Sequence, residues 1–257
     1  MKEETPKAFF VVSRYRNDIS WIKDYTDDFV IYDKSNTLPL CSKVIKVPNV
    51  GYNIHDILHF IIHNYNCLPK LTAFLEGNPF DHCKRETFNK LIYNTKFTAI
   101  EDYSHLTPKQ EGEIVDGDAF VRIGNTWKGP HGDKTKIKYR PYKKDIDGGY
   151  MEINTSWYMY AHFTTYGPEA NKFFGYFGDL LNEVFDVYRV DHPKWIRFAP
   201  GAQYIVPKKN ILFYSKQFYE KLIGYVNYCK MPAEAHLIER ALYSIFTNRW
   251  SERAQRE

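Results

Sequence analysis

Residues 71–82, LTAFLEGNPFDH, decide how the fold of this chain is interpreted. The segment 71–75 is a short apolar run of the kind that forms a buried strand. The run stops at Glu76, and glycine, asparagine and proline follow at once, which is typical of a turn. Asp81 and His82 come next. The stretch therefore predicts a buried strand that delivers Glu76, Asn78, Asp81 and His82 to its tip.

The segments on both sides of this strand alternate in the same way between strand and helix patterns. Apolar runs rich in β-branched and aromatic residues predict strands at 8–15, 28–36, 42–49, 70–78 and 97–106. Helical spacing of apolar residues predicts helices at 17–25, 50–69 and 85–94. Asn17 or Asp18 is the expected cap of the first helix, and Asn53 that of the second.

This alternation predicts an α/β fold, in which a mainly parallel sheet is covered by helices on both faces. Ligands of such sheets bind outside the carboxyl ends of the strands. Polar residues follow the predicted strands at these ends, namely Arg14, Asp33, Asn49, Glu76 and Asn78. We therefore expect one shared cleft, although loops at strand ends are polar in any protein.

The rest of the chain is compatible with one domain over residues 1–257, with a more helical final third. Helices are predicted at 171–188, 215–229 and 232–246, with a short strand and turn at 201–213. The chain is 44% hydrophobic, which is enough for a sizeable core, and its net charge of +4 does not imply a polyanionic partner. The four cysteines lack metal spacing and are expected to be buried free thiols. With no signal-peptide pattern or transmembrane segment, we expect a cytoplasmic protein.

Residues 122–144 differ from their surroundings because they carry eight Lys or Arg residues against one Asp. Three glycines and two prolines in the same segment predict a long loop or a hairpin. It is either a solvated loop or a flap that meets phosphate groups on a donor or on a polyanionic acceptor.

A row of histidines, His55, His59 and His63, falls on one face of the second predicted helix. Two of them could bind zinc with a third ligand, or one or two of them could simply be hydrogen-bonded packing histidines. His55 lies in the first turn, where a helix N-terminus favours an anion such as phosphate, and Gly51 would allow close approach of a ligand. The sequence lacks a dinucleotide fingerprint, a P-loop and a serine-hydrolase elbow.

Glu76 occupies the place where nucleotide-sugar transferases hold the donor diphosphate through a divalent metal. Carboxylate oxygens suit Mn²⁺ or Mg²⁺, and the metal neutralises the leaving diphosphate. The usual D-x-D pair is replaced here by Glu76, Gly77 and Asn78, so Asp81 or His82 would have to complete the site. The alternative is that Glu76 and Asn78 only cap a tight turn.

The segments SRYRNDISWI, IYDKSN, VPNVGYNIHDILHFIIHNY, LP and FLEGNPFDH together carry a resemblance to a known family. They resemble a glycosyltransferase-like family of domains of unknown function, over about residues 8–83 and more moderately over 197–247. The order of elements is also similar to A-type (GT-A) glycosyltransferases. The resemblance implies a nucleotide-sugar-binding half at 1–105, a variable basic region at 106–160 and an acceptor-side helical half at 161–257.

The resemblance also implies roles for individual residues. Those expected to hold the nucleoside are Arg14, Tyr15, Asp33 and Lys34. Those expected to line the diphosphate and sugar are Asn49, Gly51 and His55, with Gln203 also on the donor side. Those expected at the metal or leaving group are Glu76, Asn78, Asp81 and His82. In the absence of D-x-D, Lys34, His55 or the basic segment would neutralise the leaving group instead.

A carboxylate of the C-terminal half is expected to act as general base in an inverting displacement. Glu239 is the first choice and Glu234 the second, although Glu239 and Arg240 could also form a plain surface pair. The sequence therefore predicts a glycosyltransferase that takes a nucleotide-sugar such as a UDP-sugar. Its hydroxyl acceptor is a glycan, a protein or a modified nucleobase, and the basic segment makes nucleic acid or an anionic glycan conceivable.

Two alternatives remain open. One is a metal-dependent hydrolase that uses His55, His59 and His82. The other is a non-catalytic protein that binds a nucleotide-sugar or nucleic acid on the same fold.

Overall fold

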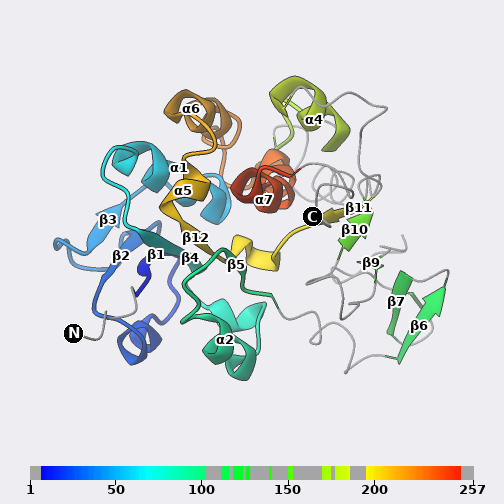
Figure 1. Ribbon diagram of the computed structural model, residues 1–257, viewed down its shortest axis with the longest axis horizontal. Helices are drawn as coiled ribbons and strands as arrows, with labels where there is room; N and C mark the ends of the chain where they lie inside the picture. Colours follow the sequence, from blue (N-terminus) through cyan, green and yellow to red (C-terminus); the bar gives the residue numbers. More distant parts are fainter. Residues whose placement is uncertain are drawn as a thin grey trace.

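The computed structural model describes residues 7–101, 170–174, 177–185 and 195–249, and short strands at 111–115, 118–123, 126–127, 139–140 and 150–152. Its centre is a six-stranded sheet in the order β3-β2-β1-β4-β12-β5 (Figure 1). The strands are β1 (Phe9–Arg14), β2 (Phe29–Asp33), β3 (Val44–Lys46), β4 (Leu71–Glu76), β5 (Thr98–Ala99) and β12 (Tyr204–Pro207). β1 pairs in parallel with β2 and β4, and β2 with β3, whereas β12 is antiparallel to β4 and β5. The predicted α/β fold with a mostly parallel sheet is confirmed.

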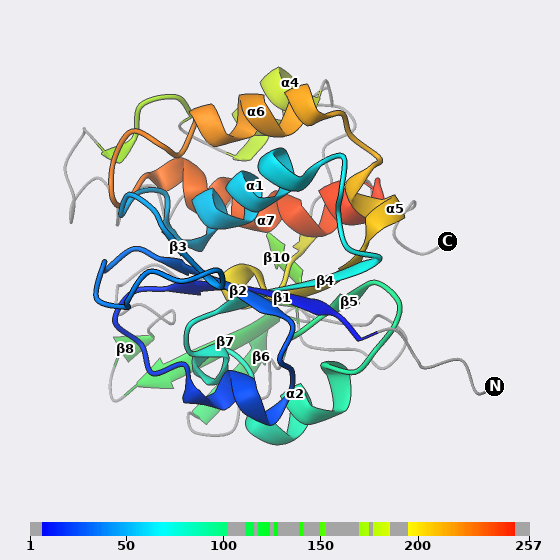
Figure 2. The same ribbon diagram turned by 90° about the vertical axis from the view of Figure 1, so that its left-hand side faces the viewer.

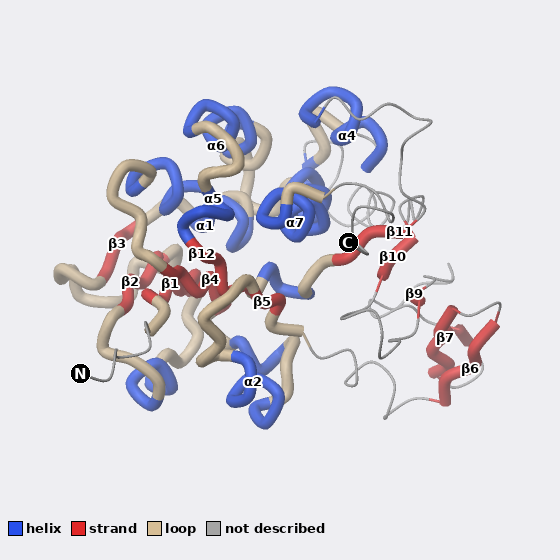
Figure 3. Tube along the Cα trace, viewed as in Figure 1, coloured by secondary structure: helices blue, strands red, loops and turns tan. Residues whose placement is uncertain are grey.

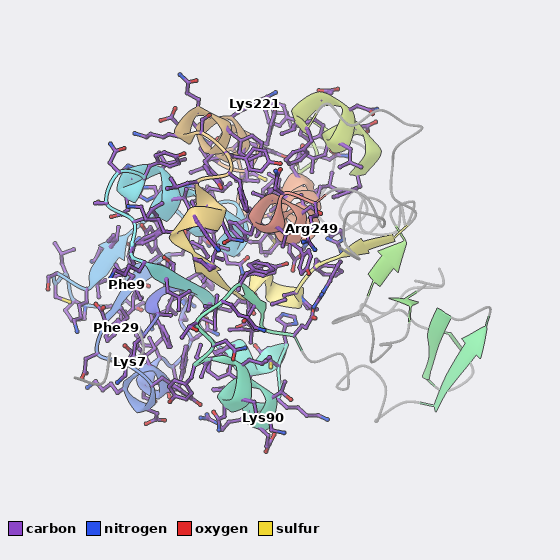
Figure 4. The ribbon with its side chains drawn as sticks, viewed as in Figure 1. Lys7, Phe9, Phe29, Lys90, Lys221 and Arg249 are labelled. Carbon is purple, nitrogen blue, oxygen red and sulfur yellow. The ribbon has the colours of Figure 1, made fainter. Side chains whose placement is uncertain are left out.

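Helices cover both faces of this sheet (Figures 2 and 3). One face carries α1 (Tyr52–Asn64) and α7 (Ala233–Thr247), with α4 (Phe177–Phe185) and α6 (Lys216–Gly224) outside them. The other face carries α2 (Arg85–Leu91) and the 3-10 helix η1 (Ser20–Asp24). In Figure 4, Lys221 of α6 and Lys90 of α2 lie at opposite outer edges, with side chains filling the layers between them.

The two faces follow from the two-residue period of a strand, because neighbouring side chains point to opposite sides. In β1, Val11 packs with the α1 and α7 layer, whereas Phe10 and Val12 pack with η1 and α2. In β4, Phe74 belongs to the first core and Leu75 to the second. Strands buried on both faces explain the nearly continuous apolar runs in the sequence.

Two predicted helix caps are wrong. The N-cap of α1 is Gly51, with a left-handed φ of +63°, and Asn53 lies inside the helix. A Cβ at Gly51 would lie 2.6 Å from the carbonyl oxygen of Val226, so glycine is needed here for the backbones to pack. The first predicted helix is the shorter η1, and its N-cap is Ile19 instead of Asn17 or Asp18.

The C-terminal segment enters the sheet through an irregular turn. β11 (Trp195–Arg197) leads into the 3-10 turn η6 (Pro200–Ala202), then β12, and then the short helix α5 (Lys208–Ile211). Gly201 and Ala202 both have positive φ, +75° and +53°. A left-handed conformation costs a non-glycine residue about 1–3 kcal/mol and is often found at functional sites.

A second sheet has the order β11-β10-β9-β7-β6, with β8 paired to β7. Its other strands are β6 (Glu111–Val115), β7 (Asp118–Ile123), β8 (Thr126–Trp127), β9 (Tyr139–Arg140) and β10 (Tyr150–Glu152). The basic segment 122–144 thus contains part of a β7–β8 hairpin and all of β9, as the hairpin alternative predicted. The remainder of this segment lies outside the described residues, and so does the predicted flap that would meet phosphate groups.

All four cysteines are free, but the expectation that they are buried holds only for Cys83, because Cys41 and Cys67 are exposed and Cys229 is half-buried. In the described parts of the chain, no helix has both the length and the apolar character needed to cross a membrane.

Candidate functional site

A cleft of ≈ 350 Å³ opens at the carboxyl ends of β1, β2 and β4. β2 and β3 follow β1 on one side of the sheet, and β4 pairs with the opposite side of β1. The cleft therefore lies at a topological switch point, where ligands of open α/β sheets bind. Its lining includes the predicted residues Arg14, Tyr15, Lys34, Asn49, Glu76, Asn78, Asp81 and His82. The other six predicted residues are not part of this lining, namely Asp33, Gly51, His55, Gln203, Glu234 and Glu239.

Asp33 lies behind the cleft lining and holds one of its residues in place. It is completely buried and accepts a hydrogen bond of 2.8 Å from Arg14 Nη1 and one of 2.9 Å from the Leu38 N–H. Burial alone would raise the pKa of Asp33, but hydrogen bonds from Ser35, Leu38 and Arg14 outweigh it and lower the pKa. Asp33 therefore fixes the guanidinium of Arg14 at the cleft wall.

A second buried carboxylate, Asp56, holds three neighbours together beneath the cleft. Its Oδ1 lies 3.0 Å from Lys34 Nζ and 3.1 Å from His55 Nδ1, and its Oδ2 accepts a hydrogen bond from Ser13. Lys34 also donates to the carbonyl of Val50 at 2.5 Å. Burial lowers the pKa of Lys34, while Asp56 acts in the opposite direction. The positive charge of Lys34 is thus already compensated by protein groups.

The histidine row shares one face of α1, as predicted. The ring centroids of His55 and His59 are 5.8 Å apart, and those of His59 and His63 are 3.8 Å apart and stacked. Burial, followed by the neighbouring histidines, lowers the pKa of His59 to about 4. His59 also lies 3.4 Å from the Tyr32 hydroxyl. The three rings therefore pack along one face of the helix, and the lowered pKa keeps the His59 imidazole neutral.

Two carboxyl groups from distant segments meet at Gly201. The Gly201 N–H donates to Glu239 Oε1 at 2.8 Å, and Asn53 Nδ2 donates to the Gly201 carbonyl at 2.6 Å. A Cβ on Gly201 would lie 2.8 Å from Glu76 Cδ and 2.7 Å from His82 Cδ2. Only glycine leaves room for this arrangement, and its positive φ requires the same residue.

The pKa values of these two carboxyl groups are shifted in opposite directions. Burial, then the charges of Glu239 and Asp81, raise the pKa of Glu76 well above its ordinary value. Burial opposes ionisation of Glu239 as well, but the hydrogen bond from His236 and the charge of Arg240 lower its pKa. A pair of carboxyl groups with separated pKa values is typical of acid–base chemistry. Glu76, whose side chain is 26% exposed, is the member that faces the cleft.

The metal-ligand prediction for Glu76, Asp81 and His82 finds no support in the arrangement of these side chains. Asp81 Oδ1 accepts a hydrogen bond of 2.6 Å from Asn78, and His82 Nε2 lies 3.5 Å from Glu76 Oε2. In the described part of the chain, no group of three or more His, Cys, Asp or Glu side chains could hold a metal ion.

The remaining predicted residues have structural contacts away from the cleft. Glu234 is completely buried and accepts hydrogen bonds from the Lys172 and Phe173 N–H groups and from the Tyr228 hydroxyl. Gln203 is also buried and donates to the Pro79 carbonyl at 3.1 Å. Glu234 therefore fastens the segment before α4, and Gln203 holds the turn after β4.

Several cleft residues were not predicted as site residues. They are Ser13, Asn17, Tyr52, Asn53, Lys230 and Met231, with Asp56 beneath. Asn17 and Asn53 were predicted to be helix caps and therefore were not considered as site residues. Lys230 and Met231 lie just before α7, and nothing in their local sequence indicates that they return to the first strands. Tyr52 has a left-handed φ of +51°, which only the structure reveals.

Comparison of the chain with protein-family models, with curated proteins and with solved structures finds no match.

Proposed function

We propose that this protein is a glycosyltransferase of A-type architecture, which transfers a sugar from a nucleotide-sugar donor to a hydroxyl acceptor. The observation that carries the proposal is the cleft at the switch point of the sheet, with Glu76 at the end of β4 on its lining. The resemblance to a glycosyltransferase-like family leads to the same location from the sequence motifs.

The cleft offers groups that suit a nucleoside diphosphate. Asn49, Tyr52 and Asn53 line it at the first turn of α1, where N–H groups and the helix dipole favour an anion. Lys230, in the segment just before α7, contributes a cation, and its Nζ lies 5.4 Å from the centre of the Tyr15 ring. The exposed ring of Tyr15 provides a surface on which a base can stack. These groups would neutralise a leaving diphosphate without a metal ion.

Glu76 is the proposed general base, because it borders the cleft and its raised pKa makes its carboxylate a stronger base than an ordinary glutamate. The acceptor oxygen forms a bond to the anomeric carbon while the bond from that carbon to the diphosphate oxygen breaks. The acceptor proton passes to the Glu76 carboxylate, and the nucleoside diphosphate leaves with the bonding electron pair. Glu239 remains ionised, and its negative charge adds to burial in raising the proton affinity of Glu76.

A thermal-shift panel of UDP-, GDP- and CMP-sugars tests the proposal. A ligand that binds only the folded protein raises the melting temperature, by an amount set by its concentration relative to Kd. We expect a selective rise with one donor, reduced in Lys230→Ala and retained in Lys221→Ala, which removes a lysine on the outer surface of α6 (Figure 4). If no nucleotide-sugar of the panel raises the melting temperature of the folded protein, the cleft is not a donor site.

A second candidate, a non-catalytic nucleotide-sugar-binding protein, is favoured by one specific observation. The described residues lack a metal-binding group, and the sequence lacks the D-x-D pair. Release of nucleoside diphosphate from the donor by the wild-type protein, abolished in Glu76→Gln, separates the two. If the donor binds tightly but no nucleoside diphosphate is released with any acceptor tested, the non-catalytic binding protein is favoured. Within the described residues, His55, His59 and His82 do not form such a group, which argues against the metal-dependent hydrolase.

A further inference from the structure

A second hollow, of ≈ 330 Å³, adjoins the cleft. It lies between η1 and the 3-10 turn η2 (Pro79–Asp81) that follows β4, and Asn17 and Asn78 line both spaces. The wall between them is tight, since a Cβ at Gly77 would lie 2.9 Å from Asn17 Oδ1. The Trp21 indole fixes the same wall by donating to the Gly77 carbonyl at 2.9 Å. Both volumes are within the range of small-molecule sites, about 300–1,000 Å³.

The two asparagines at the boundary offer one donor and one acceptor. Asn17 Oδ1 accepts from the Tyr15 N–H at 3.2 Å, and Asn78 Nδ2 donates to Asp81 at 2.6 Å. The opposite amide atoms, Asn17 Nδ2 and Asn78 Oδ1, have no hydrogen bond to the part of the protein that the structure describes. A hydroxyl group both donates and accepts, so it matches this pair.

The rest of the hollow has the groups that recognise a polyol. Asp18 and Asp24 supply exposed carboxylates, and hydrogen bonds from the Ser20 N–H and hydroxyl lower the pKa of Asp18. Arg85 supplies donors, and its guanidinium is held 3.9 Å above the Phe80 ring. Two carboxylates against one guanidinium repel a phosphate backbone, which argues against nucleic acid here. Mixed donors and acceptors suit a neutral molecule with several hydroxyls.

We propose that this hollow is the acceptor subsite and that it binds a neutral saccharide, whose reacting hydroxyl lies between Asn17 and Asn78. This inference rests on the proposed transferase function, because it assigns the second substrate of the same cleft. It differs from the expectation that the helical C-terminal half forms the acceptor side.

Saturation-transfer NMR on the full chain tests the subsite directly. The probes are methyl glycosides of glucose, galactose, mannose and N-acetylglucosamine and their β1,4- and α1,4-linked disaccharides. We expect saturation of at least one probe, with Kd raised about tenfold in Asp24→Asn, the size of effect that loss of a hydrogen bond to a charged group produces. Asp27→Asn, an exposed aspartate of the same segment outside the hollow, is the matched control and keeps Kd within about twofold.

The outcomes separate this inference from the proposed function. If no probe is saturated, or if Asp24→Asn binds as tightly as the wild type, the subsite is refuted even if nucleotide-sugars raise the melting temperature. If a saccharide binds in the hollow and no nucleotide-sugar binds the cleft, the hollow is a saccharide-binding site, but the transferase proposal and the acceptor role both fail. In Asp24→Asn, the nucleotide-induced melting shift is expected to match that of the wild type.

Discussion

Glu76 at the end of β4 and Glu239 on α7 interact electrostatically across Gly201, and this interaction contributes to the raised pKa of Glu76. The glycine binds Glu239 through its N–H and leaves space for Glu76 on its other side. Burial and the nearby like charge both disfavour the ionised form of Glu76, so its carboxyl group holds a proton to higher pH than an ordinary glutamate.

Gly201→Ala is expected to destabilise the protein by about 1–3 kcal/mol, because its φ of +75° is left-handed and the added Cβ would collide with Glu76 and His82. Urea unfolding measures the change. Gly224→Ala is the matched control: a Cβ there has no atom within 4 Å, and the substitution on α6 should stabilise by about 0.4–1 kcal/mol. Equal effects of the two substitutions would contradict the assigned packing.

Glu76→Gln is expected to become more stabilising relative to wild type as the pH rises. A raised pKa means that the folded state binds the Glu76 proton more tightly than the unfolded state does. The stability this gives is complete below the ordinary pKa of 4.5 and is lost as the pH rises through the raised value. Unfolding free energies at pH 4 and pH 8 should therefore differ between variant and wild type mainly at pH 8.

For Asp33→Asn, the effect on stability is expected to depend on pH in the opposite direction. The pKa of Asp33 is lowered, so its contribution to stability is present above the ordinary value of 3.8 and is lost as the pH falls through the lowered value. We expect Asp33→Asn to be destabilised at pH 7 and progressively less so toward acid pH. If both variants follow the same trend with pH, the assignment of one of the two pKa shifts is wrong.

Asp56→Asn is expected to cost about 3–5 kcal/mol, because it leaves the buried Lys34 ammonium without its counter-charge. Chemical denaturation measures the loss. The matched control is Glu220→Gln, which breaks a surface pair with Lys216 at 3.7 Å and should cost no more than about 0.5 kcal/mol. A loss below about 1 kcal/mol for Asp56→Asn would show that Lys34 is not held as an ion pair.

Removal of divalent metal is expected to leave donor binding intact. The melting shift produced by the selected nucleotide-sugar should be the same after EDTA treatment as with added Mn²⁺, within about twofold in apparent Kd, because the described residues provide no metal-binding group. A shift that requires Mn²⁺ would overturn this expectation. It would show that Glu76 and the donor diphosphate assemble a metal site only in the complex.

Much of the candidate site could be predicted because polar residues that directly follow buried strands must lie at one edge of a parallel sheet. Arg14, Asn49, Glu76 and Asn78 were predicted in this way, and all four line the cleft. Residues that reach the cleft from elsewhere could not be found in this way. Lys230 precedes a helix, and Asn53 looked like a cap, so no local pattern marked either as a site residue.

The sequence by itself determined the alternation of strands and helices, the two buried faces of the sheet and the position of Glu76 at a strand end, since these depend on local periodicity. Only the tertiary structure decided what Glu76 meets. Because β12 runs antiparallel to β4, with Tyr204 opposite Phe74, the turn before β12 lies beside the end of β4. That pairing brings Gly201, and with it Glu239, to Glu76, and the direction of a strand in its sheet is fixed by long-range pairing that local sequence does not encode.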